Sequence, residues 1–181
     1  MAESKRIPKS PLRSLTDPLR WYWYPLVITS LEVSFIVGLL YPMDLETARS
    51  IVRQLEEVRR SLGSYPALLA NNLGGALMMM APFVGFPYAI FTAFLNGNYT
   101  KAYSVVSGSN PLAAGSSLLM MPSTILQFIA FALSANESLI LNNAFFSRRL
   151  SQEAKVAVII LCVISAILAL GLAIGMTFGQ P

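Results

Sequence analysis

The sequence predicts an all-α integral membrane protein with about five transmembrane helices and one extracytoplasmic amphipathic helix at residues 44–62. The first observation is composition: 55% of the 181 residues are hydrophobic and only 12% are charged, whereas a soluble domain carries about a quarter charged residues. The second is that the charges gather in three segments, at residues 3–20, 44–60 and 148–155. The long apolar stretches between them exclude a soluble globular enzyme and a disordered chain.

Four apolar stretches supply the five predicted spans, because a spanning helix needs about 20 mostly apolar residues. The second stretch has no charge over 36 residues, which is too long for one ordinary span and long enough for two short ones. Pro82, Gly85 and Pro87 mark a break in its middle, where a helix loses hydrogen-bond donors. A re-entrant segment within residues 66–100 is the alternative. The stretches are residues 21–42, 65–100, 111–136 and 156–178.

The distribution of basic residues predicts which ends of the spans face the cytoplasm. Residues 1–20 form a basic N-terminal tail, which we place in the cytoplasm, and residues 21–181 form a single transmembrane domain. Arg148, Arg149 and Lys155 precede the last span and are expected on the same side. Three crossings between these two basic segments satisfy both constraints. The prediction is therefore a multi-pass protein of the plasma membrane with an extracytoplasmic C-terminus.

Residues 44–62 have the periodicity of an amphipathic helix between the first two spans, with apolar side chains at three- and four-residue steps. Asp44 is suited to cap its N-terminus. The segment has no net charge, so it is expected to pack on the membrane domain or on a neighbouring subunit rather than to bind lipid through charge. Oppositely charged residues four positions apart are expected to pair, and these are Arg53 with Glu57 and Glu56 with Arg60.

Glu32 lies in the middle of the first predicted span. A charge at that depth costs at least about 2.5–3.5 kcal/mol unless it is protonated or paired. Structural pairing with a neighbouring helix or another chain is one explanation, and a role in transport chemistry is the other. The sequence offers no histidine and no other ionisable residue predicted in mid-span, so a proton relay would have too few members.

Carboxamide side chains recur in the second to fourth predicted spans. Amides in lipid must be satisfied by other helices, so they serve either as hydrogen-bonding contacts between helices or as the lining of a polar cavity. Asn96 and Gly97 are also suited to a turn at the membrane surface. The candidate carboxamides are Asn71, Asn72, Asn96, Asn98 and Gln127.

A further polar group follows the fourth predicted span. It consists of Asn136, Glu137, Asn142 and Asn143. Because polar side chains are costly in lipid, this group indicates that the chain leaves the apolar region after about residue 135.

The last predicted span carries small residues at four-residue spacing, which lets another backbone approach closely. Packing within the chain and association with another chain are both consistent with this pattern. The two rows of small residues are Gly171, Gly175 and Gly179, and Ser165, Ala169 and Ala173.

The residues needed for most cofactor and metal chemistry are missing from the sequence. It contains no histidine and one cysteine, Cys162, which argues against haem, zinc, copper and iron–sulfur sites. Catalysis would need a nucleophile with a base, a metal site or paired carboxylates, so we expect no cofactor, no metal site and no enzymatic activity. The net charge of +4 is explained by membrane topology, and no nucleic-acid partner is expected.

Three motifs follow one another from the second to the fourth predicted span: LLANNLGGAL with an Asn pair, PFVGFPYAI with a glycine bend, and FLNGNY with Asn-Gly. Together with the preceding span and amphipathic segment, this order resembles the stage II sporulation protein M (DUF95) family of integral membrane proteins, over roughly residues 21–178. The Pro-His-Gly stretch of that family and the Glu after it correspond here to Pro122, Ser123, Thr124 and Gln127. The chain therefore resembles a divergent member.

The resemblance implies a membrane component of a multiprotein complex, since the sporulation member works in a complex that remodels peptidoglycan. Many relatives have no established activity. Ser123 and Gln127 replace the two most chemically capable positions of the family, so the resemblance implies packing there rather than acid–base or ion-coupling chemistry.

These observations lead to two functional hypotheses. The first is a non-catalytic subunit or scaffold of a larger membrane complex, which packs through small-residue helix faces and the amphipathic helix. Its expected partners are other membrane protein subunits, in a hetero-oligomer, and lipids. The alternative is a small permease-like transporter, with Glu32 and the intramembrane amides lining a path.

Overall fold

The computed structural model describes residues 18–178, which form helices joined by short turns, with no strand. The predicted all-α fold class is confirmed for this part of the chain. Expectations for residues 1–17 and for Gly179 lie outside the described residues. The helices are α2 Pro18–Trp21, α3 Tyr24–Leu40, α4 Leu45–Ser61, α5 Tyr65–Met80, α6 Gly85–Ser107, α7 Pro111–Leu119, α8 Pro122–Phe146 and α9 Leu150–Phe178.

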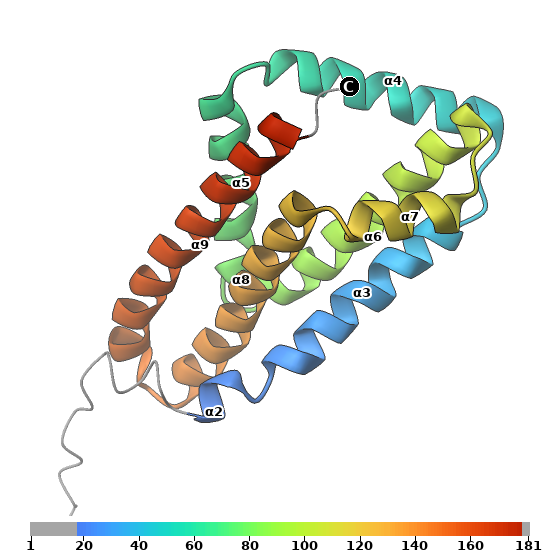
Figure 1. The fold of residues 1–181 in the computed structure, drawn as a ribbon. Coiled ribbons are helices and arrows are strands. Elements are labelled where there is room, and N and C mark those ends of the chain that lie inside the picture. Colours follow the sequence, from blue (N-terminus) through green and yellow to red (C-terminus); the bar gives the residue numbers. More distant parts are fainter. Residues whose placement is uncertain (1–17, 179–181) are drawn as a thin grey trace, which may run out of the picture.

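Helices α3, α5, α6, α8 and α9 form an elongated bundle in which successive members run in opposite directions (Figure 1). Helix α4 crosses one end of this bundle and α7 lies near the same end, which we call the α4 end. The opposite end, the α2 end, holds α2 and the turns at residues 81–84 and 147–149. There the Asn142 Oδ1 accepts a hydrogen bond from the Phe83 N–H at 2.5 Å, which ties the α5–α6 turn to α8.

Helices α8 and α9 are the two helices within residues 18–178 that are long and apolar enough to cross a membrane. Helix α3 is also apolar but has 17 residues. Large apolar side chains lie exposed on the outward faces of these helices, among them Val33 on α3 and Val163 and Leu170 on α9. Apolar surface of this extent is typical of a surface that meets lipid or another protein.

The predicted fourth span, residues 111–136, is wrong in both its bounds. Residues 111–119 form the separate helix α7, whose N-terminus is capped by the Asn110 Oδ1 accepting a hydrogen bond from the Leu112 N–H at 2.9 Å. The chain turns at Met120 and starts again at Pro122, because proline has no N–H to continue a helix but fits the first helical position. Helix α8 then runs on for 25 residues.

The predicted break within residues 65–100 is confirmed, and it lies between Met80 and Gly85. A Cβ added at Gly85 would lie 2.1 Å from the Met79 carbonyl oxygen, so only glycine allows this close approach of α5 and α6. The alternative of a turn at Asn96 and Gly97 is wrong, because α6 continues through both residues.

The predicted amphipathic helix is present as α4, and Asp44 caps it as expected. The Asp44 carboxylate accepts a hydrogen bond from the Thr47 N–H at 2.8 Å. Hydrogen bonds from Thr47 lower the pKa of Asp44, so the cap is present at neutral pH and is lost only as the pH falls through this lowered pKa. The two ion pairs expected within the helix are not formed, since the salt bridges within residues 18–178 join Arg20 to Glu137 and Glu153.

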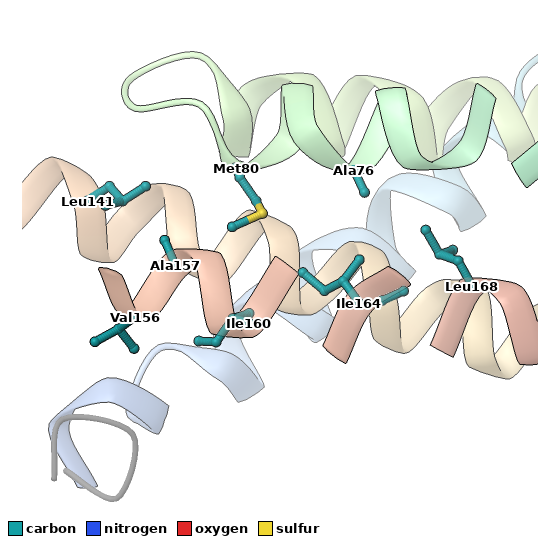
Figure 2. Close-up of a cluster of buried hydrophobic side chains, with 9 residues drawn as sticks. Ala76, Met80, Leu141, Val156, Ala157, Ile160, Ile164 and Leu168 are labelled. Carbon is teal, nitrogen blue, oxygen red and sulfur yellow. The ribbon is translucent and has the colours of Figure 1, made fainter. Parts of the chain in front are cut away.

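Two clusters of buried apolar side chains hold the bundle together. One lies where α5 packs on α8 and α9, and Figure 2 shows Ala76 and Met80 of α5 extending toward the α9 side chains Ile160 and Ile164. The other lies between α3, α5, α6 and α8, where small residues let the helices approach closely. Its buried members are Val27, Leu31, Met79, Ala89, Ala93, Ala132 and Ala135.

Helices α3 and α6 meet backbone to backbone at two glycines. A Cβ added at Gly97 would lie 2.0 Å from the Phe35 carbonyl oxygen, and one added at Gly38 would lie 2.0 Å from the Phe94 carbonyl oxygen. The Ser34 hydroxyl strengthens the contact by donating a hydrogen bond to a backbone carbonyl of α6 at 2.7 Å. Helices α3 and α6 therefore make the closest kind of helix–helix contact, in which the two backbones touch.

Gly97→Ala is expected to lower the free energy of unfolding by at least about 1–3 kcal/mol, the usual cost of overpacking a tight contact. Gly75→Ala on α5 is the matched control, since a Cβ there meets nothing within 4 Å. Thermal unfolding of the two purified variants measures the difference. Equal melting temperatures would contradict the close approach of α3 and α6.

Candidate functional site: an amide-lined chamber and a buried arginine

Arg20 lies in α2 and is buried against α8 and α9, with 5% of its surface exposed. Its Nη2 donates a hydrogen bond to the Glu137 Oε2 at 2.5 Å, and its Nη1 donates to the Glu153 Oε2 at 2.7 Å. Charge-assisted hydrogen bonds of this kind are stronger than neutral ones. One guanidinium shared by two carboxylates therefore joins three segments that are far apart in the sequence.

The polar segment that follows residue 135 continues helix α8, and its first residues, Asn136, Glu137 and Ser138, are buried against the rest of the chain. The Asn136 Nδ2 donates a hydrogen bond to the Arg20 carbonyl at 3.3 Å, and the Ser138 hydroxyl donates to the Ala81 carbonyl at 2.8 Å. Buried polar groups with partners of this kind are compatible with a helix interior. Glu137, 1% exposed, is a second carboxyl group on a long apolar helix besides Glu32, and unlike Glu32 it is buried.

The sequence pattern groups Arg20 with the basic tail, which is why the buried ion cluster was not predicted. A signal is nevertheless present, because Glu137 is the one charged residue between positions 102 and 147. A single charge inside an uncharged stretch of that length needs a partner from elsewhere in the chain. The two carboxylates each accept a hydrogen bond from the guanidinium, so the cluster holds α2 on the bundle.

A polar chamber of about 620 Å³ lies between α5, α6 and α8. It brings together four of the carboxamides that the sequence predicted, Asn71 and Asn72 from α5, Asn96 from α6 and Gln127 from α8. The α5 backbone at Gly74 and Gly75 and the side chains of Tyr88, Thr92, Met78, Met79 and Phe131 complete the lining. Asn98 does not line it.

The four carboxamides have no hydrogen-bond partner among the described residues. Each carboxamide carries two donor hydrogens and an acceptor oxygen. The alternative in which these amides join helix to helix is therefore not what the structure shows. They present their hydrogen-bonding groups to the chamber.

A second, largely apolar pocket of about 460 Å³, which we call the vestibule, lies beneath α4 and adjoins the chamber. The two share Asn96, Gln127 and Phe131. Helix α4 contributes Leu55 and Val58 to the vestibule, so part of its apolar stripe faces the same chain. The vestibule places the chamber within reach of the α4 end of the bundle.

Glu32 lies outside the chamber. It is exposed on the outer face of α3, whereas Leu31 and Phe35 on the inner face are buried. Glu32 and the amides therefore do not line one path, as the permease alternative expected. No described residue pairs with Glu32.

Two of the small residues of α9, Gly171 and Gly175, face the same chain, whereas Ala173 of the other row is exposed. A Cβ added at Gly171 would lie 3.2 Å from the Leu126 Cβ of α8, and one added at Gly175 would lie 3.4 Å from the Ser123 Cβ. The neighbouring row contains Ala169, whose carbonyl accepts a hydrogen bond from a tyrosine of α5 at 2.9 Å. For Gly171 and Gly175 the structure therefore shows the first alternative, packing within the chain.

Comparisons of the chain with models of protein families, with curated proteins and with solved structures give no match. Within residues 18–178 no three His, Cys, Asp or Glu side chains are grouped to hold a metal ion. Cys162 is a free, exposed thiol on α9.

Arg20→Met is expected to lower the free energy of unfolding by about 3–5 kcal/mol, because it leaves Glu137 buried without a counter-charge. Arg149→Met, at an exposed arginine of the α8–α9 turn, is the matched control and should change stability little. Chemical unfolding of both variants measures the effect. Similar losses in the two variants would contradict a buried ion cluster.

Proposed function

We propose that this chain is a non-catalytic, multi-pass subunit of a larger complex in the plasma membrane, and that the outer face of α3 is its docking surface. In this proposal α3, α5, α6, α8 and α9 are the five crossings. The α2 end faces the cytoplasm and the α4 end faces outward. The observation that carries the docking proposal is the position of Glu32.

The arrangement of helices and charges supports five crossings. The five bundle helices alternate in direction, as successive spans must. Helices α3 and α5 are about 24–26 Å long, slightly shorter than the hydrocarbon layer of about 30 Å, and tilt or local thinning accommodates such differences. Arg148, Arg149 and Lys155 lie toward the α2 end, which agrees with the positive-inside rule.

Glu32 is at the midpoint of α3, on a largely apolar face whose other exposed polar residue, Thr29, donates its hydroxyl hydrogen bond to the Pro25 carbonyl of the same helix. Its exposed neighbours on that face include Leu26, Val33 and Ile36. A carboxyl group facing hydrocarbon at mid-depth is costly unless a donor satisfies it. Because no described residue of this chain does so, the donor is expected to come from another polypeptide.

The chemistry of Glu32 favours a different polypeptide over a second copy. Two copies related by a two-fold axis along α3 would bring two Glu32 carboxyl groups together, and like charges at close range cannot both remain ionised. A spanning helix with an amide, hydroxyl or basic side chain at mid-depth satisfies the carboxyl group directly. The resemblance to the stage II sporulation protein M family, which implies a component of a multiprotein complex, agrees with this choice.

The number and direction of the membrane crossings are tested with single cysteines introduced into a Cys162→Ser variant. Ser109→Cys lies between α6 and α7, and Ser147→Cys lies between α8 and α9, both at exposed positions. A membrane-impermeant maleimide should label intact cells at position 109 and should label position 147 only after permeabilisation. The reverse order, or labelling of both from one side, would contradict the proposed crossings.

The docking surface is tested with a photo-crosslinking amino acid at Val33. Val163 on α9 is the matched control, because the two valines are 54% and 49% exposed. We expect a crosslink to a second polypeptide from position 33 and none from position 163. Identical crosslinking patterns at the two positions would contradict docking through α3.

Glu32→Leu should lower recovery of that second polypeptide about five- to thirty-fold, as expected from the loss of 1–2 kcal/mol per interhelical hydrogen bond. Glu32→Gln keeps hydrogen-bonding capacity and should lose less. Unchanged recovery in both variants, measured by quantitative co-purification, would remove Glu32 from the interface.

A further inference from the structure

We propose that the amide-lined chamber binds an uncharged, polyhydroxylated solute of about monosaccharide size. This inference rests on the chamber and is independent of docking through Glu32. It starts from the four carboxamides that have no hydrogen-bond partner among the described residues. Asn71 and Asn96 are exposed and Asn72 and Gln127 are half-buried, so their hydrogen-bonding groups are open to a molecule that enters the chamber.

The lining excludes charged solutes. The described residues around the chamber include no Asp, Glu, Lys or Arg. A charge moved from water into such a site would have no counter-charge, which is costly in a low dielectric. A neutral solute carries no such penalty, so the chamber selects for zero charge.

The lining also favours hydroxyl groups. A hydroxyl both donates and accepts hydrogen bonds, and a carboxamide offers both functions side by side. The hydroxyl groups of Tyr88 and Thr92 add to the four carboxamides on α5, α6 and α8. The rings of Tyr88 and Phe131 provide apolar surface for the C–H faces that a polyol also presents.

The size of the chamber agrees with this class. Ligand sites commonly measure about 300–1,000 Å³, and the chamber measures about 620 Å³. The vestibule beneath α4 provides the approach, since Asn96 and Gln127 line both spaces. The one charged side chain that lines the vestibule, Arg59, lies outside the chamber itself.

The test is thermal unfolding of the whole chain in lipid nanodiscs, because the sugar heads of glycoside detergents would compete for the chamber. The neutral probes are glucose, galactose, mannose, sorbitol and glycerol. Glucosamine and gluconate have similar size and carry a charge, and urea is neutral without hydroxyl groups. At 100-fold its dissociation constant, a bound probe should raise the melting temperature by about 5–10 °C.

Polyols also stabilise proteins by exclusion from their surface. Specific binding is therefore measured as the difference between variants in the shift of the melting temperature. Gly75→Leu fills the chamber from a position where a Cβ meets nothing within 4 Å, and it should abolish the specific shift. Asn143→Leu removes an exposed carboxamide outside the chamber and should retain it. Asn72→Leu is the second chamber variant if Gly75→Leu does not fold.

The expected result is a shift with at least one neutral polyol in the wild type and Asn143→Leu, and none in the chamber variants. Equal shifts in wild type and Gly75→Leu would overturn the proposal. So would binding of glucosamine or gluconate as tightly as glucose, a response to urea alone, or no response to any probe. Glu32→Leu should leave the shift unchanged, which separates this result from the docking proposal.

Discussion

Every polar group inside an apolar helical bundle needs a partner, and this constraint organises the α2 end of the molecule. The Arg20 guanidinium joins Glu137 to Glu153, and its carbonyl accepts a hydrogen bond from Asn136. Helices α2, α8 and α9 are thereby held by one buried network. Since an unpaired buried charge costs more than a pair contributes, the network defines how these three elements meet.

In the half of the bundle nearer α4, the polar groups meet this constraint in a different way. The carboxamides around the chamber have no partner among the described residues, and neither has Glu32 on the outer face of α3. The α2 end thus forms most of its polar contacts internally, although the Arg20 Nε and the Asn136 Oδ1 are buried without a partner among the described residues, whereas the polar groups of the other half are open to molecules outside the chain. This contrast separates structural polar residues from functional candidates more clearly than residue type does.

Features that depend on neighbouring residues were predictable from the sequence: the helical class, the cap at Asp44 and the proline-rich break between α5 and α6. Features that depend on distant contacts were not. A polar residue such as Glu137 resembles the end of a span until its partner Arg20 is known, and a row of small residues containing Gly171 has the same pattern whichever helix it faces. The bounds of the predicted fourth span were wrong because Pro122 divides an apolar stretch that composition alone treats as continuous.

Gly38 and Gly97 leave no side chains between the α3 and α6 backbones to absorb movement. Helix α3 carries Glu32 outward, while α6 carries Tyr88 and Asn96 to the chamber wall. The outer face that carries Glu32 and the chamber wall that carries Asn96 therefore belong to one tightly packed pair of helices, so a substitution that separates the pair at Gly97 would disturb both surfaces together.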